Sequence, residues 1–130
     1  MATVFTKILS GEIPSYKILE DESFLAFLDI SPLQKGHVLV IPKKETDFIF
    51  DIEDKELGEM ICFAKKCAQM IRKAIPCKKV GVAVVGLEVA HAHIHLIPIN
   101  SIEDMNFSKT KLLLSSEELG EIRDVIVNQV

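Results

Sequence analysis

His91-Ala92-His93-Ile94-His95 is the most informative stretch of this sequence. Three of the four histidines in the chain lie here, two residues apart, with small or apolar residues between them. A β-strand directs successive side chains to opposite faces, so an extended segment would point all three imidazole rings to one side. A helix would spread the same rings over about 400° of arc, at roughly 100° per residue. The apolar and β-branched residues that follow, Leu96 to Ile99, favour a strand.

Three interpretations of this histidine segment are open from the residues alone. The first is a half-buried strand whose polar face is rich in histidine. The second is a metal site, although histidines two and four residues apart on a strand lie roughly 6.6 and 13 Å apart. One Zn²⁺ ion with bonds of about 2.0–2.1 Å would take two neighbouring rings but hardly the third. The third is catalysis, in which a neutral imidazole attacks phosphorus while its neighbours orient it and stabilise charge.

Composition and charge limit the classes of protein that fit. The 130 residues suffice for one domain with one hydrophobic core, so we expect a single domain over residues 1–130. Hydrophobic residues make up 48% and charged residues 26%, which is typical of soluble globular proteins. The net charge of −4 without a basic block argues against a nucleic-acid partner. A single small nucleotide could still be bound by backbone N–H groups and histidine.

The sequence also predicts a cytoplasmic protein with no membrane partner. Residues 1–7 lack the long apolar region of a signal peptide, and no apolar run approaches the ~18 residues of a membrane span. The odd number of cysteines and the lack of a Cys-x-x-Cys pair argue against a disulfide framework or a cysteine-based zinc site. Cys62, Cys67 and Cys77 fit reduced thiols, with Cys67 in the core.

Three helices are predicted. A short helix over residues 4–10 is capped by Thr3 and ended by Gly11. The clearest helix spans residues 54–75, with Asp51 as its N-cap. A capping box from Ser115 to Glu118 opens the last helix, which runs to about Asn128. The predicted apolar face of the long helix consists of Leu57, Met60, Ile61, Ala64, Cys67, Ala68, Ile71, Ala74 and Ile75.

Five strands complete the predicted pattern. They cover residues 16–20, 24–28, 37–42, 80–85 and the histidine segment. The resulting order is α-β-β-β-α-β-β-α. Short turns between consecutive strands favour a mostly antiparallel sheet, and the long helix would cover one of its faces. We therefore expect an α+β domain.

At this point the sequence resembles the histidine triad (HIT) family. The family signature, His-φ-His-φ-His-φ-φ with φ an apolar residue, is met by residues 91–97. Further blocks, in the order typical of the family, extend the resemblance over roughly residues 3–98. Within the family, the sequence most resembles the Hint-like branch, which comprises nucleoside phosphoramidases and related nucleotidyl hydrolases. These blocks are Phe5–Ile8, Gly11–Pro14, Glu20–Asp21, Leu25–Pro32 and Gly36–Lys44.

The resemblance implies a fold and a reaction. The fold is a five-stranded antiparallel half-barrel with one long helix, a short N-terminal helix and a C-terminal helix. Its core would span about residues 3–100, followed by a tail and helix at 101–130, and the chain would form a homodimer. In the reaction, His93 would attack the α-phosphorus of a purine nucleoside 5′-phosphoramidate. Water would then hydrolyse the covalent nucleotidyl-histidine to an AMP-like product.

Other residues take roles by their position in the family pattern. His95 would donate a hydrogen bond to the phosphate oxygens, and His91 would orient its neighbours. Asp29 would accept the ribose hydroxyls, although it could instead cap its own loop. His37 matches a family position, yet it also fits a hydrogen-bonded core residue. The remaining substrate-binding candidates form apolar walls around the base, and each could equally be plain core: Phe5, Ile8, Phe27, Ile30 and Val89.

The sequence departs from the family pattern at two places. Thr3 and Thr6 stand where some members carry a zinc-binding Cys-x-x-Cys. We therefore expect no required cofactor, and any zinc at His37 and His91 would be incidental. Before the triad, Leu87 replaces the usual Gln, and Glu88 replaces a Ser or Thr that helps to protonate the leaving group. Glu88 could act as a general acid only if its surroundings keep it protonated.

The sequence thus favours a nucleotidyl hydrolase and leaves alternatives open. A dinucleoside polyphosphate hydrolase is the second enzyme candidate, and Leu87 argues against it because that branch typically uses the missing Gln. The altered residue Glu88 also keeps open a nucleotide-binding module with little catalysis. A dedicated zinc protein is a third class.

Overall fold

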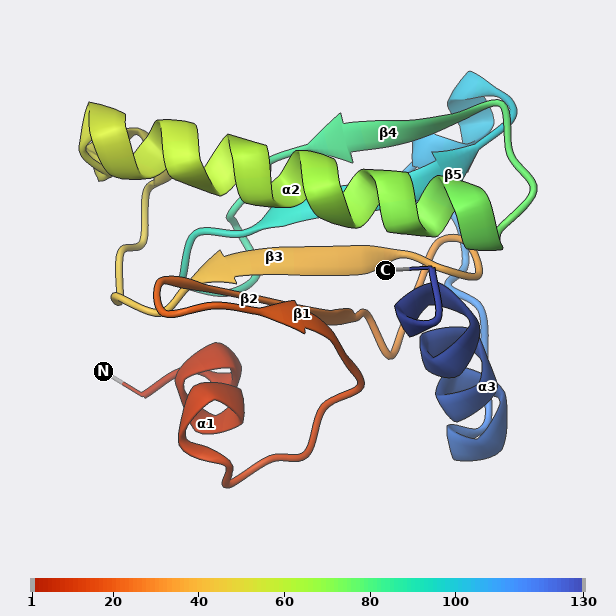
Figure 1. Cartoon of the computed structure of the whole chain (residues 1–130), viewed down its shortest axis with the longest axis horizontal. Coiled ribbons are helices and arrows are strands. Elements are labelled where there is room, and N and C mark those ends of the chain that lie inside the picture. The colour runs from red at the N-terminus through yellow and green to blue at the C-terminus, as the bar shows by residue number, and fades with distance from the viewer. Residues whose placement is uncertain (1, 130) are drawn as a thin grey trace.

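The computed structural model describes residues 2–129, which form a five-stranded antiparallel sheet with helices on both faces (Figure 1). The strand order is β1-β2-β3-β5-β4, so the sheet is open and β1 and β4 are its edges. The predicted α+β class, the antiparallel sheet and the order of elements are confirmed. The elements are α1 (Val4–Ser10), β1 (Lys17–Glu20), β2 (Phe24–Leu28), β3 (Val38–Pro42), α2 (Asp54–Ala74), β4 (Lys79–Ala83), β5 (Ile94–Ile99) and α3 (Ser116–Val127), with 3-10 turns η1 (Ile49–Asp51) and η2 (Ile102–Met105).

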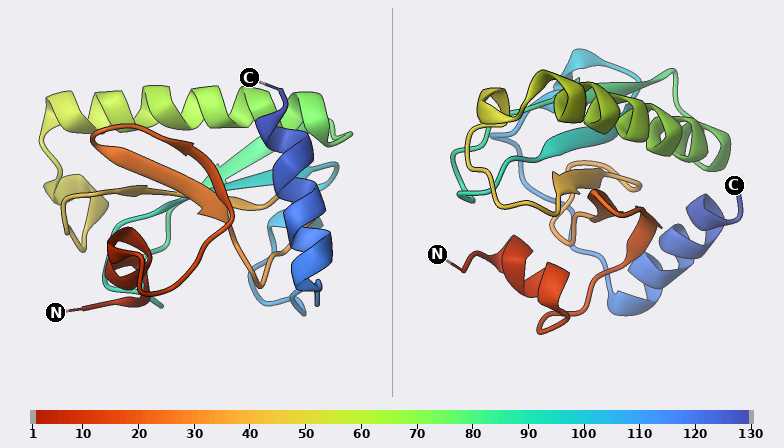
Figure 2. Two further views of the ribbon diagram at one scale, coloured as in Figure 1. Left: turned by 60° about the horizontal axis from the view of Figure 1, so that its bottom comes forward. Right: turned by 60° about the vertical axis from the view of Figure 1, so that its left-hand side comes forward.

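The central strands are buried on both faces, which explains why their sequences are almost continuously apolar. In β3, Val38 and Val40 pack into the large core beneath α2, whereas Leu39 and Ile41 pack into a smaller core on the opposite face. α2 covers the first face and α1 lies on the second (Figure 2). Strand alternation therefore sends the odd-numbered side chains of β3 and β5 towards α1, and His95 is one of them.

α1 has the predicted bounds, and the two threonines at its start close it. Thr3 Oγ1 accepts a hydrogen bond from the Thr6 backbone N–H at 3.2 Å, and Thr6 Oγ1 accepts one from the Thr3 N–H at 2.7 Å. Gly11, at φ 86°, ends the helix in the left-handed conformation that glycine adopts without strain. The residues at the positions of a family zinc pair thus form a capping box in this chain.

α2 corrects two details of the sequence prediction. Asp51 is not its N-cap, because residues 49–51 form η1 and the helix starts after Glu53. Ile61 is 51% exposed, since it lies about 100° around the helix from the buried Met60. Phe63 and Met70 occupy the buried face instead. None of the helices in residues 2–129 combines the length and apolar character that crossing a bilayer requires.

Cys67 is fully buried on α2, as the sequence predicts. Burial raises the pKa of its thiol to about 12. The thiol therefore stays protonated and acts as a small apolar core residue.

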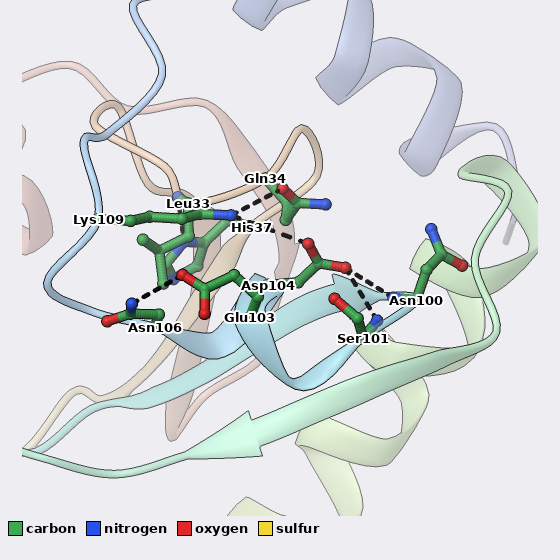
Figure 3. A network of polar contacts seen from close by, with 9 residues as sticks. All are labelled: Leu33, Gln34, His37, Asn100, Ser101, Glu103, Asp104, Asn106 and Lys109. Carbon is green, nitrogen blue, oxygen red and sulfur yellow. Dashed lines mark hydrogen bonds and ion pairs between the residues drawn. The ribbon is translucent and has the colours of Figure 1, made fainter.

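The segment after β5 is tied back to the loop between β2 and β3. Lys109 Nζ lies 3.4 Å from Gln34 Oε1 and 3.8 Å from Asp104 Oδ1 (Figure 3). The Leu112 N–H donates to the Pro32 carbonyl at 2.9 Å. α3 then packs Leu119 and Ile126 into the core that α2 covers. These contacts fix residues 103–112 beside the histidine segment.

Candidate active site

Only the last histidine of the segment lies in a strand. β5 begins at Ile94, which corrects the prediction of a strand through the whole triad. The backbone before Ile94 leaves the sheet: the His91 N–H donates to Val89 O at 2.8 Å, and the Ala92 N–H donates to Thr46 O at 2.7 Å.

The three rings nevertheless lie along one side of the segment. The His93 ring centroid lies 5.0 Å from that of His95, and Phe5 contacts both His91 and His93. Ala92 and Ile94 point into the opposite core, as predicted. The alternation that the sequence suggested is therefore retained through the irregular start of the triad.

One ring nitrogen of His93 is held by a hydrogen bond, and the other makes none within residues 2–129. Its Nδ1 lies 2.7 Å from the His91 carbonyl oxygen, and since a carbonyl only accepts, Nδ1 carries the proton and donates. In the neutral ring, Nε2 then holds a lone pair. Nε2 makes no hydrogen bond within residues 2–129 and is not fully buried. It therefore reaches the surface of the two cavities that His93 lines. This geometry is that of a nucleophile.

His37 sets the tautomer of His95. The Leu33 N–H donates to His37 Nδ1 at 3.1 Å, so the neutral His37 ring carries its proton on Nε2. That proton is donated to His95 Nδ1 at 2.9 Å. His95 must then carry its own proton on Nε2, which makes it a hydrogen-bond donor. His37 itself is 1% exposed, and both of its ring nitrogens are used inside the protein.

Gly36 allows the chain to place His37 there. Its φ is 93°, and a Cβ at this position would lie 3.0 Å from Ile75 Cγ1 and 3.2 Å from Pro98 Cγ. A residue with a side chain would therefore be strained and crowded at this point. The loop thus enters β3 in the one register that points His37 at His95.

Burial lowers the pKa values of His37, His93 and His95 and so favours their neutral forms near pH 7. The pKa of His37 is lowered to about 3, mainly by desolvation and further by the neighbouring His95. Desolvation and His93 lower the pKa of His95 to about 4. Desolvation also lowers the pKa of His93, opposed by its hydrogen bond to the His91 carbonyl. Neutral rings are what a nucleophile and a fixed-tautomer donor require.

Asp29 lies at the end of β2, beside this histidine pair. Its Oδ1 accepts the Ser31 N–H at 2.9 Å, the loop-capping bond that the sequence left open as an alternative. Its Oδ2 lies 3.7 Å from His37 Nε2, but no ion pair forms because His37 is neutral at pH 7. Burial raises the pKa of Asp29. Oδ2 accepts no hydrogen bond within residues 2–129 and can accept one from a ligand hydroxyl.

Two cavities meet at the histidines. The first, of about 280 Å³, is mainly apolar, and we name it the apolar cavity. The second, of about 150 Å³, is the polar cavity. Four residues line both, namely Asp29, Glu88, His93 and His95. The apolar cavity gathers all the predicted base-binding residues: Phe5, Ile8, Phe27, Ile30 and Val89.

The predicted site residues differ in how they reach this space. Glu88 is exposed at the rim shared by both cavities, and His37 lines only the polar cavity. The His91 ring lines neither cavity: its Nε2–H donates to Pro42 O at 2.8 Å, and its buried Nδ1 has no partner within residues 2–129. His91 contributes its backbone carbonyl, which binds His93 Nδ1, and not its ring.

The structure does not pair His37 with His91 as potential zinc ligands. Within residues 2–129, the one set of three ligand groups close enough to share an ion is Asp29, His37 and His95, whose ligand atoms lie within 4.8 Å of one another. The two facing ring nitrogens of that set already share a proton at 2.9 Å. A metal ion there would have to replace the hydrogen bond that fixes the His95 tautomer.

Sequence reasoning did not predict the two residues that the C-terminal tail contributes to the polar cavity. Phe107 places its ring 4.9 Å from that of His95, and Lys111 lines the same cavity. Both come from the tail after β5, which carries no motif. The available signal was that Phe107 is the sole aromatic residue after position 100.

A family model described as the HIT domain matches residues 10–102. The chain therefore belongs to the histidine triad family, as its sequence predicted. An uncharacterised HIT-like protein of Methanocaldococcus jannaschii is 38% identical over 126 residues, covering 92% of this chain and 98% of that protein. Adenosine 5′-monophosphoramidase HNT1 of Saccharomyces cerevisiae is 38% identical over 98 residues, covering 75% of this chain and 62% of the yeast protein.

Solved structures agree with the family assignment. A crystal structure of a HIT-like protein from Bartonella henselae superposes with a TM-score of 0.86 at 29% identity, covering 98% of this chain and 96% of that one. The family thus includes hydrolases such as the yeast phosphoramidase. The family match ends at residue 102, so Phe107 and Lys111 lie beyond it.

Proposed function

We propose that the protein hydrolyses purine nucleoside 5′-phosphoramidates, or related AMP conjugates, through a covalent nucleotidyl-histidine. The observation that carries this proposal is the His93 ring, whose Nδ1 proton is bound by the His91 carbonyl and whose Nε2 reaches the cavities. Similarity to the yeast protein named adenosine 5′-monophosphoramidase supports the choice of substrate.

The reaction is proposed in two displacements. His93 Nε2 forms a bond to the α-phosphorus while the phosphorus–nitrogen bond breaks, and the departing amine takes a proton from water at the rim. Glu88 is exposed there and lacks the enclosing surroundings that its predicted role as general acid would need. Water then attacks the phosphorus, the bond to Nε2 breaks, and AMP leaves with His93 restored. His95 Nε2–H is the proposed donor to the non-bridging oxygens, whose charge grows as phosphorus becomes five-coordinate.

The apolar cavity is the proposed site of the nucleoside. Phe5 and Phe27 pack edge to face, with ring centroids 5.7 Å apart, and form a wall suited to a planar base. Asp29 Oδ2 would accept the ribose hydroxyls. The apolar wall itself offers no donor pattern that separates adenine from guanine.

Incubation with adenosine 5′-phosphoramidate is expected to release AMP, measured by liquid chromatography. The rate should be unchanged after chelation and metal analysis, because no step is assigned to a metal ion. Faster turnover of a diadenosine triphosphate than of the phosphoramidate would favour the polyphosphate hydrolase instead. AMP binding without turnover of either compound would reduce the protein to a nucleotide-binding module and contradict the proposed activity.

We also propose that the protein forms a homodimer through β4. This edge strand leaves backbone N–H and C=O groups unpaired on one side, a ready template for a second strand. Val82 and Val85 are 60% and 52% exposed, and the adjoining surface carries Phe48 and Phe50 at 57% and 73%. Val85, Phe48 and Phe50 line one shared surface hollow. Exposed apolar surface of this kind marks an interaction site, and a second copy of the same edge supplies both the strand and the apolar partner.

The dimer is tested by the solution mass from light scattering after gel filtration. The wild-type chain should run at twice its monomer mass, and the double variant Val82→Lys/Val85→Lys should shift to the monomer. Val125→Lys, which places the same charge at an exposed apolar position of α3, is the matched control and should remain dimeric. A monomeric wild type at micromolar concentration would refute the proposed interface.

A further inference from the structure

The two cavities divide the proposed substrate into two parts. The nucleoside fills the apolar cavity, and the reacting phosphorus must lie beside His93, among the four residues that both cavities share. In an in-line displacement the leaving group departs on the side of the phosphorus away from the nucleophile. The part of the polar cavity that is not shared is therefore the space for the leaving group.

A cation from the tail lines that space. Lys111 is half-buried, and its Nζ donates one hydrogen bond, to the Phe107 carbonyl at 2.8 Å. It makes no ion pair within residues 2–129. An ammonium group has three N–H donors, so two are free for a ligand. These free donors can bind an anionic group of a ligand.

Two carboxylates, Asp29 and Glu88, line the same cavity as Lys111. Lys111 acts electrostatically on Asp29 as well as on His37 and His95, but it forms no ion pair with that carboxylate within residues 2–129. The Phe107 ring contacts the His95 ring on one side. The Lys111 ammonium lies 6.0 Å from the centroid of the same Phe107 ring. The polar cavity has a volume of about 150 Å³. It fits a phosphate or carboxylate group close to the scissile bond.

On the basis of the proposed function, we propose that Lys111 is a specificity-determining residue that selects leaving groups with an oxyanion close to the bond that breaks. Two kinds of substrate share this chemistry. One is an AMP amidate of an amino acid, which carries a carboxylate beside the nitrogen. The other is a nucleoside phosphoanhydride, whose leaving group is itself a phosphate. A charge-assisted hydrogen bond from Lys111 would bind either.

The test uses a pair of substrates that differ by one charge. The adenosine 5′-phosphoramidates of alanine and of alaninamide have nearly the same size, and only the first carries a carboxylate. Wild type should show a kcat/KM for the alanine compound at least about tenfold above that for alaninamide, as expected for one charge-assisted hydrogen bond. Lys111→Met should bring this ratio close to one, and Lys111→Arg should restore most of it. Lys73→Met, which removes an exposed cation on α2, is the control and should keep the wild-type ratio.

A second arm measures phosphate release from ADP, the phosphoanhydride counterpart. If Lys111→Met lowers kcat/KM only for ADP, Lys111 selects phosphoanhydride leaving groups. If it lowers kcat/KM only for the alanine compound, Lys111 selects carboxylates. Either result supports the proposal. Equal losses on all three compounds, or no loss on either the alanine compound or ADP, overturn the role of Lys111 and leave the proposed hydrolase intact. If wild type releases AMP from none of these compounds, the proposed function fails and the inference fails with it.

Discussion

Replacing His93 with alanine is expected to lower AMP release from adenosine 5′-phosphoramidate by roughly 10⁴- to 10⁶-fold, the scale seen when a catalytic nucleophile is removed. Without the ring there is no lone pair to form the covalent intermediate, and water would have to attack phosphorus directly. The loss should fall on kcat, measured by initial rates of AMP formation under saturating substrate.

The same variant should keep its fold and its nucleotide site. The His93 ring contacts Phe5 but makes no hydrogen bond to β3 or α2, so the apolar cavity retains its other walls. We therefore expect AMP to raise the melting temperature of His93→Ala as well as that of the wild type. Turnover within tenfold of wild type would show that another residue attacks phosphorus.

Stability is expected to fall steeply between pH 7 and pH 5. The folded protein holds the pKa of His37 at about 3 and that of His95 at about 4, whereas both titrate near 6.5 in the unfolded chain. Below pH 6.5 the unfolded state binds more protons than the folded state, so the free energy of unfolding decreases as pH falls. Two such histidines would remove about 4 kcal/mol between pH 7 and pH 5. Urea unfolding at pH 7, 6 and 5 measures this loss.

A variant without one of these groups provides the comparison. His37→Asn carries no titrating ring, and its loss of stability between pH 7 and pH 5 should be about half that of the wild type. Asp29 has the opposite effect on the free energy of unfolding. Its pKa is raised in the folded protein, so it adds stability as the pH falls through that pKa. The measurement therefore stops at pH 5. A wild-type free energy of unfolding that is flat from pH 7 to pH 5 would show that the histidines are not buried in neutral form.

Much of the fold was predictable because its signals are local. The Thr3 cap and Gly11 bound α1, the capping box bounds α3, and the apolar runs of β2 and β3 mark strands buried on both faces. The errors arise where tertiary contacts override a local pattern. The start of α2 at residue 54 was predicted correctly, but its N-cap was not, because η1 takes up Asp51. β5 starts later than predicted because the backbone at Ala92 bonds to Thr46, a residue far away in sequence.

The site was predictable only in part, for the same reason. The spacing of the triad and the resemblance to the family supplied His93, His95 and Asp29, which the structure places around one space. The hydrogen bond from His37 to His95 joins residues 58 positions apart, and nothing in the local sequence encodes it. The placement of Lys111 depends on how the tail is tied to the β2–β3 loop, which only three-dimensional coordinates reveal.

The central claim is that phosphorus is bonded to His93 during turnover. Rapid acid quenching over a single turnover of adenosine 5′-phosphoramidate, followed by peptide mass spectrometry, tests it most directly. We expect a transient nucleotidyl group on the peptide that contains His93, rising before AMP and decaying as AMP appears. AMP formation with no adduct at any time point, or an adduct on a different residue, would contradict the account.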